Sequence, residues 1–122
     1  MKLRKSEIIS LVIVIISLII GIYFYPLMPE KVASHWNAEG KVDGYMPKFW
    51  GLFLMPIISA VLLFLFIIIP KIDPLKHNIE KFRKYFDGFI VLMMVFLFYL
   101  YILTFFEVLP FLCYLLVSLF LF

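Results

Sequence analysis

Cysteine and charge are both scarce in this sequence, and each scarcity excludes a class of protein. The chain of 122 residues has a single cysteine, Cys113, so no disulfide framework can form within it. Charged residues make up 16% of the chain, whereas a soluble domain carries about a quarter. These few charges gather in three short stretches instead of one basic surface. That distribution is typical of membrane topology and argues against a nucleic-acid partner.

Apolar residues take up most of the remaining sequence. Hydrophobic residues make up 66% of the chain and aromatic residues 20%, with fifteen phenylalanines. A soluble chain of this length buries only about two-thirds of its surface, which would leave many of these side chains in water. The composition therefore predicts an all-α integral membrane protein with the lipid bilayer as its main partner.

Three runs are long enough to cross a hydrocarbon core of about 30 Å as helices. They cover residues 8–25, 51–69 and 88–106, and end at Pro26, Pro70 and Glu107 respectively. Pro56 is expected in the first turns of the second span, where its missing N–H matters little. The first run is too long for a signal-peptide core and no cleavage site follows it, so we expect an uncleaved helix.

A shorter apolar stretch covers residues 109–122. Its length leaves three interpretations open: a short fourth span, a re-entrant piece, or part of a longer helix. We favour a fourth, incomplete membrane helix. The tail and the loop 70–87 hold eight of the eleven Lys and Arg residues, which predicts a multi-pass protein of the plasma membrane with a cytoplasmic N-terminus.

The predicted outer loop, residues 26–50, carries the features of a structured segment. Residues 32–36 alternate in character and favour an extended strand. Asn37 to Gly40 follow as a turn in which the glycine takes a positive φ, and Asp43-Gly44 offers a second turn. Pro47 suits the first turn of the next helix.

The predicted inner loop, residues 70–87, favours a short basic amphipathic helix in the membrane interface. Apolar residues recur at helical spacing from Asn78 onward, and basic residues occupy the other face. We expect Glu80 and Lys84 to form an i,i+4 pair. Asp73-Pro74 predicts a turn before this helix.

Both loops resemble motifs of a known family, the SdpI-type immunity proteins. The outer loop resembles the signature of their N-terminal membrane domain in the strings Tyr25-Pro26-Leu27-Met28-Pro29, His35-Trp36-Asn37, Gly40, Asp43-Gly44 and Pro47-Lys48. The inner loop resembles their second motif in Pro70-Lys71-Ile72-Asp73-Pro74, Asn78 and Phe82. The resemblance covers about residues 8–106 and has two departures. Ala33 stands where the family often has proline, and family members continue through further membrane helices beyond the point where this sequence ends.

The resemblance implies a role in toxin immunity or envelope sensing. The outer-loop residues that would recognise a secreted peptide toxin or another signal are His35, Trp36, Asn37, Gly40, Asp43, Gly44 and Lys48. The inner-loop residues that would face a cytoplasmic regulator are Asp73, Pro74, Asn78 and Phe82. If immunity requires the further helices of the family, we expect this chain to act with a partner.

The sequence disfavours several other functions. His35, Asn37, Glu39 and Asp43 are a poor zinc set, and the calcium-binding EF-hand pattern is absent, so no metal or cofactor is predicted. The bilayer separates the polar residues of the two loops, which argues against an enzyme. The predicted spans lack ionisable groups, which disfavours a transporter. A non-catalytic membrane subunit or a small transporter component is the alternative, and Ser17 and Gly21 permit packing within one chain or in a homo-oligomer.

Overall fold

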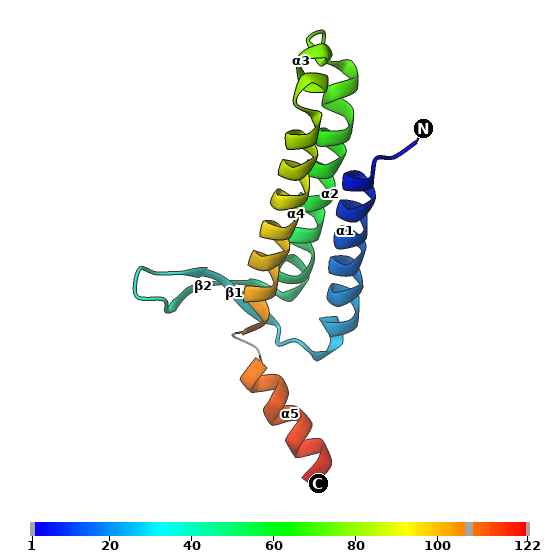
Figure 1. Cartoon of the computed structure of the whole chain (residues 1–122). Helices are drawn as coiled ribbons and strands as arrows, with labels where there is room; N and C mark the ends of the chain where they lie inside the picture. Colours follow the sequence, from blue (N-terminus) through cyan, green and yellow to red (C-terminus); the bar gives the residue numbers. More distant parts are fainter. Residues whose placement is uncertain (1, 107–108, 122) are drawn as a thin grey trace.

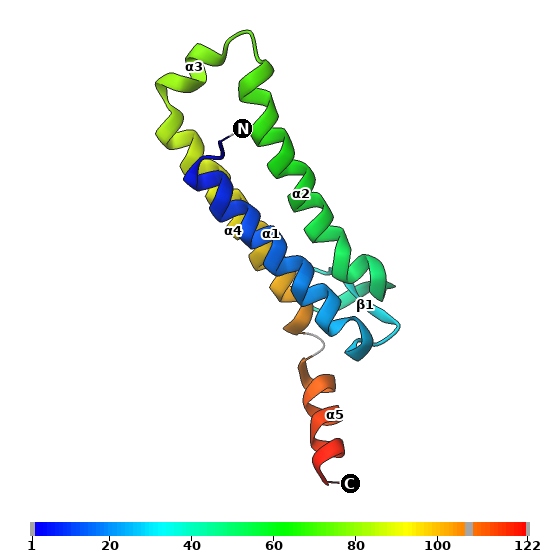
Figure 2. The same cartoon turned by 90° about the vertical axis from the view of Figure 1, so that its right-hand side faces the viewer.

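Three long helices lie side by side and form the body of the protein. The computed structural model of the chain describes residues 2–106 and 109–121. The long helices are α1 (Lys5–Phe24), α2 (Lys48–Ile72) and α4 (Arg83–Phe106) (Figures 1 and 2). By length and composition all three can cross a membrane. The protein is therefore an all-α, multi-pass membrane protein, as the sequence predicts.

Short elements connect and extend the bundle. A 3-10 turn, η1 (Tyr25–Leu27), ends α1, and the strands β1 (Lys31–Trp36) and β2 (Val42–Pro47) form a hairpin before α2. A short helix, α3 (Lys76–Lys81), joins α2 to α4, and α5 (Leu109–Leu121) follows α4. We call the end of the bundle with α3 and the N-terminus the basic end, and the opposite end the hairpin end (Figure 1).

Each long helix extends beyond its predicted span. Because α2 begins at Lys48, Pro56 lies in the helix interior, and the prediction that it occupies the first turns is wrong. The helix also continues through Pro70, which was predicted to end it. Glu107, predicted to close the third span, and Phe122, the predicted end of the fourth segment, lie outside the described residues.

Pro56 has a consequence for helix packing. Proline lacks an N–H, so the carbonyl of Leu52, four residues earlier, loses its helical partner. Gly21 of α1 lies against this carbonyl, since a Cβ built on Gly21 would stand 3.1 Å from Leu52 O. Because Gly21 has no side chain, α1 can approach α2 closely at the Leu52 carbonyl, which lacks a helical hydrogen-bond partner.

Small residues on one face of α1 allow the close packing. The buried residues of this helix recur at helical spacing: Ser6, Glu7, Ser10, Val14, Ser17 and Gly21. The Ser17 hydroxyl donates to its own helix at Ile13 O, at 2.9 Å, and the buried Tyr101 hydroxyl of α4 donates to Ser17 O at 3.2 Å. The small-residue pair predicted from the sequence therefore serves packing within one chain.

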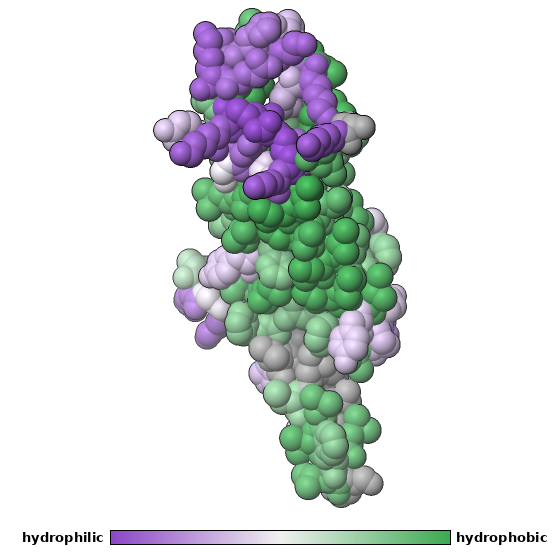
Figure 3. All heavy atoms as spheres, turned by 45° about the vertical axis from the view of Figure 1, so that its right-hand side comes forward, coloured by the Kyte–Doolittle hydropathy of each residue, from purple (hydrophilic) through white to green (hydrophobic). Residues whose placement is uncertain are grey.

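Two apolar clusters fill the space between the helices. The cluster near the hairpin end contains Met28, Val32, Leu52, Tyr101 and Phe105. The cluster nearer the basic end contains Val14, Leu63, Ile90 and Met94. Most other apolar side chains point outward, and Figure 3 shows a hydrophobic belt below a hydrophilic cap at the basic end. This arrangement suits a lipid environment.

The predicted amphipathic helix of the inner loop is interrupted. The helix α3 has only six residues and ends at Phe82, where the backbone leaves the helical region before α4 begins. Glu80 pairs with His77 at 3.6 Å instead of with Lys84. The prediction of one continuous interfacial helix from Asn78 is therefore wrong.

The stretch predicted as an incomplete membrane helix is helical in its described part. The thirteen residues of α5 extend away from the bundle, past the hairpin end (Figures 1 and 2). At 1.5 Å per residue the helix is about 20 Å long, shorter than a hydrocarbon core of about 30 Å. Its membrane insertion stays a prediction.

Candidate recognition hairpin and groove

The predicted outer loop forms an antiparallel β-hairpin. Lys31 pairs with Pro47 at the open end of the ladder, and Trp36 pairs with Val42 next to the turn. Gly40 has φ of 79°, as the turn prediction required. The predicted extended segment and its following turn are thus confirmed.

Asn37 builds the turn at the tip of the hairpin. Its side-chain Oδ1 accepts hydrogen bonds from the backbone N–H groups of Glu39 and Lys41, both at 3.0 Å. Its backbone N–H donates to Lys41 O at 2.8 Å, and its carbonyl accepts from Gly40 N at 3.0 Å. One asparagine therefore satisfies most of the turn's backbone, which is a common role of this residue type.

Asp43 and Gly44 lie within β2, so the prediction of a second turn there is wrong. The register shifts on both sides of His35, which leaves Ser34 and Asp43 as the extra residues of two irregularities in the ladder. The Asp43 carboxylate consequently reaches His35 Nδ1. Gly44 stands opposite His35, where a Cβ would be only 3.2 Å from the histidine Cβ.

The hairpin is seated on the first turn of α2. Val32 and Ala33 of β1 are 2% and 3% exposed, so this strand is buried where it meets the bundle. A Cβ built on Gly51 would stand 1.8 Å from Val32 Cγ2. Only glycine permits this approach, and the hairpin is thereby held as a fixed part of the structure.

An apolar groove opens between the hairpin and the helices α2 and α4. A hollow of about 300 Å³ is lined by residues of β1, β2, α2 and α4, including Trp36, Met46, Trp50, Leu54 and Leu103. A second hollow of about 320 Å³ is lined by Trp36, Gly40, Leu103 and Phe106. Trp36 of the hairpin and Leu103 of α4 line both hollows, so these two side chains connect the two parts of the groove.

The predicted outer-loop residues divide into three places. Trp36 lines the groove, whereas His35, Asp43 and Gly44 meet on the hairpin and Asn37 and Gly40 form its tip. Lys48 lies apart from them at the start of α2, where its ammonium is 4.5 Å from the centroid of the Tyr25 ring. Trp36 and Gly40 of the motif therefore border the groove, whereas most of the other motif residues shape the hairpin.

The predicted inner-loop residues form turns at the basic end. Asp73 caps α2, and its Oδ1 accepts from Leu75 N at 2.8 Å in the turn that contains Pro74. The Asn78 backbone N–H donates to Leu75 O at 2.9 Å, and Phe82 separates α3 from α4. Local backbone contacts account for these positions, and the structure brings none of them to the hairpin groove.

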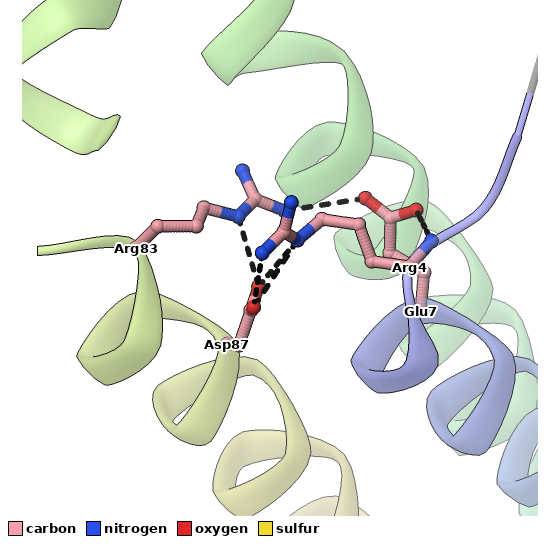
Figure 4. A network of polar contacts seen from close by, with 4 residues as sticks. All are labelled: Arg4, Glu7, Arg83 and Asp87. Atoms are coloured by element: carbon pink, nitrogen blue, oxygen red, sulfur yellow. Dashed lines mark hydrogen bonds and ion pairs between the residues drawn. The ribbon is translucent and has the colours of Figure 1, made fainter.

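A charge network at the basic end was missed by the sequence reasoning. Arg83 Nη2 donates to Glu7 Oε1 at 3.3 Å, and Arg83 Nε donates to Asp87 Oδ1 at 2.9 Å (Figure 4). Arg4 Nη2 donates to Asp87 Oδ2 at 3.0 Å. The Arg4–Asp87 and Arg83–Glu7 ion pairs join α1 to α4. The sequence shows only that each arginine is followed by a carboxylate three or four residues later, Glu7 after Arg4 and Asp87 after Arg83. Arg83, one of the basic residues of the predicted inner loop, has a side chain that is only 17% exposed.

Comparison with known proteins yields one match. Residues 12–60 match the model of a domain of unknown function, DUF1648. No curated protein and no solved structure matches the chain. The DUF1648 match runs from the middle of α1 through the hairpin to the first half of α2, so it contains both strands and Gly51. The matched segment thus includes the hairpin and the α2 wall of the groove.

Proposed function

We propose that this protein is a non-catalytic membrane receptor of the SdpI-type immunity kind, which binds an apolar part of a secreted peptide in the groove beside Trp36. The groove is the observation that carries this proposal. It combines two tryptophans with aliphatic and methionine side chains, a lining suited to an apolar ligand group. Toxin immunity or envelope sensing follows from the resemblance of the two loop motifs to that family.

The rigid seating of the hairpin supports a binding role. A loop that only connected two spans would need neither a paired strand nor the close approach at Gly51. Fixing the loop before binding reduces the entropy lost when a ligand binds. The ring of Trp36 is then held in place to contact an incoming apolar side chain, and tryptophan is enriched among residues that dominate binding energy.

Trp36→Ala will abolish protection if the groove receives the toxin. Loss of a central aromatic contact typically lowers affinity by about 2 kcal/mol, roughly thirtyfold. The measurement is the survival of a toxin-sensitive host that expresses this chain and is exposed to the secreted toxin of an SdpI-type system. A version extended by the further helices of an SdpI-type protein is tested beside it.

Two variants of Asn37 serve as the comparison. Asn37→Ala removes the acceptor of two turn hydrogen bonds and should also abolish protection, whereas Asn37→Asp keeps an acceptor oxygen and should retain it. All variants should insert into the membrane at the level of the wild type. Full protection by both Trp36→Ala and Asn37→Ala would reject the hairpin as the recognition element. Failure of both unmodified versions, despite insertion, would reject toxin immunity.

The proposal places the hairpin outside the cell and the basic end in the cytoplasm, because Lys and Arg residues favour the cytoplasmic side. A Glu39→Cys variant in a Cys113→Ser background, with its thiol at the hairpin tip, should react with a membrane-impermeant maleimide in intact cells. A cysteine at Lys76 should react only after the cells are opened. The reverse labelling pattern would overturn this orientation.

A further inference from the structure

The basic end contains a hollow that the proposed function does not use. Its volume is about 480 Å³, within the range of small-molecule sites. It is lined by residues of the N-terminal segment, the start of α1, the end of α2, α3 and the start of α4. These segments all lie at the basic end (Figure 2). Its lining residues are Lys2, Arg4, Glu7, Ile67, Pro70, Lys71, Lys76, Ile79, Glu80 and Arg83.

The charges around this hollow are unbalanced. Five of the lining side chains are cationic and two are carboxylates. Both carboxylates already have partners, since Glu7 binds Arg83 and Glu80 lies 3.6 Å from His77. Within residues 2–106 and 109–121, the ammonium groups of Lys2 and Lys76 have no carboxylate within ion-pair distance. The hollow therefore has an excess of positive charge available to an anion.

Part of the wall of the hollow is apolar. Ile67 and Pro70 of α2 and Ile79 of α3 contribute this part of the lining. Figure 3 shows that the hydrophilic cap at this end directly borders the hydrophobic belt. An occupant that reaches from the cationic part to the apolar part must itself be amphipathic and lie at the membrane surface.

We propose that this hollow binds the phosphate headgroup of an anionic phospholipid, with its glycerol backbone against Ile67 and Ile79. Lys71 and Lys76 flank the hollow from α2 and α3, and Lys2 approaches from the N-terminal segment. Basic pockets between membrane helices are suited to such headgroups. The ion pair of Arg83 with Glu7 fixes α1 to α4 and so maintains one side of the hollow. This inference is independent of the proposed function.

Native mass spectrometry of the purified full chain tests the inference. The protein is equilibrated in detergent with equal amounts of phosphatidylglycerol and phosphatidylcholine, and retained lipid is counted. We expect wild type to retain phosphatidylglycerol preferentially. The double variant Lys71→Gln/Lys76→Gln should bind it about twenty-five-fold more weakly, because each lysine contributes about fivefold to the affinity. Lys71→Arg/Lys76→Arg should keep the binding, because it keeps both charges.

The matched control is Lys81→Gln/Lys84→Gln, which removes the same charge at the same end but outside the hollow. It should bind phosphatidylglycerol within about twofold of wild type, since diffuse attraction does not retain single lipids in detergent. Equal losses in the two glutamine variants would overturn the inference, as would equal retention of both lipids by wild type. Displacement of the lipid by equimolar glycerol phosphate would identify a soluble phosphate ligand and also overturn it.

Discussion

Gly51→Ala will loosen the hairpin from the bundle and lower the free energy of unfolding by about 3 kcal/mol. The added Cβ would stand 1.8 Å from Val32 Cγ2, far inside van der Waals contact. Val32 is buried and β-branched, so its side chain has little rotational freedom to move away. The new methyl group must therefore displace β1 from α2. Unfolding in detergent and the rate of tryptic cleavage at Lys41, near the tip, measure the two effects.

A compensating substitution tests the steric explanation. Val32→Ala removes the methyl group that collides, after which the nearest side-chain atom of this residue is its Cβ at 3.3 Å. The double variant with Gly51→Ala should be at least about 1 kcal/mol more stable than the sum of the single effects. Gly88→Ala is the control, because a Cβ there meets no atom within 4 Å. Simple additivity in the double variant would contradict the collision.

Glu7→Ala will destabilise the bundle by about 2–3 kcal/mol, because a buried charged acceptor is lost while Arg83 keeps its bond to Asp87. The Glu7 side chain is 3% exposed and accepts from Arg83 and, at 2.9 Å, from the backbone N–H of Arg4. Its removal leaves the Arg83 guanidinium with one carboxylate fewer in a site of little solvent. The start of α1 also loses an acceptor for Arg4 N. The free energy of unfolding in detergent is the measurement.

Two further variants divide this effect into its parts. Glu7→Gln keeps an acceptor oxygen and removes the charge, so its loss of stability should be intermediate. Glu80→Ala breaks the ion pair with His77, in which both side chains are more than two-thirds exposed, and should change stability by about 0.5 kcal/mol or less. If Glu7→Ala is no more harmful than Glu80→Ala, the network does not join α1 to α4.

The membrane helices and the hairpin turn could be predicted because local sequence determines them. Long apolar runs predict the three spans, and Asn37 followed by Gly40 predicts a turn with a positive φ. The helix ends were less accurate, since α2 begins already at Lys48 and continues through Pro70. In lipid, a helix keeps its backbone hydrogen bonds beyond the end of the apolar run. Hydropathy alone therefore does not indicate where the helix ends.

Features that depend on distant partners could not be predicted. Asp43-Gly44 has the composition of a turn, but pairing with β1 draws both residues into a strand. Gly51 is necessary because any side chain there would collide with Val32, which lies on another element. The groove likewise depends on α4, which contributes Leu103 to its lining. Glu7 and Arg83 form an ion pair although they are 76 residues apart in the sequence. Such contacts depend on the packing of the whole bundle, so the local sequence pattern does not predict them.

The pairing of α1 with α4 also bears on the biosynthesis of the protein. The two helices run in the same direction, so they become neighbours only after α2 has returned the chain to the basic end (Figure 2). Arg83 emerges 76 residues after Glu7. At the usual speed of translation this interval is about 4–15 s. During that time the carboxylate of Glu7 must stay hydrated at the membrane surface, and the ion pair closes only when the third span is inserted.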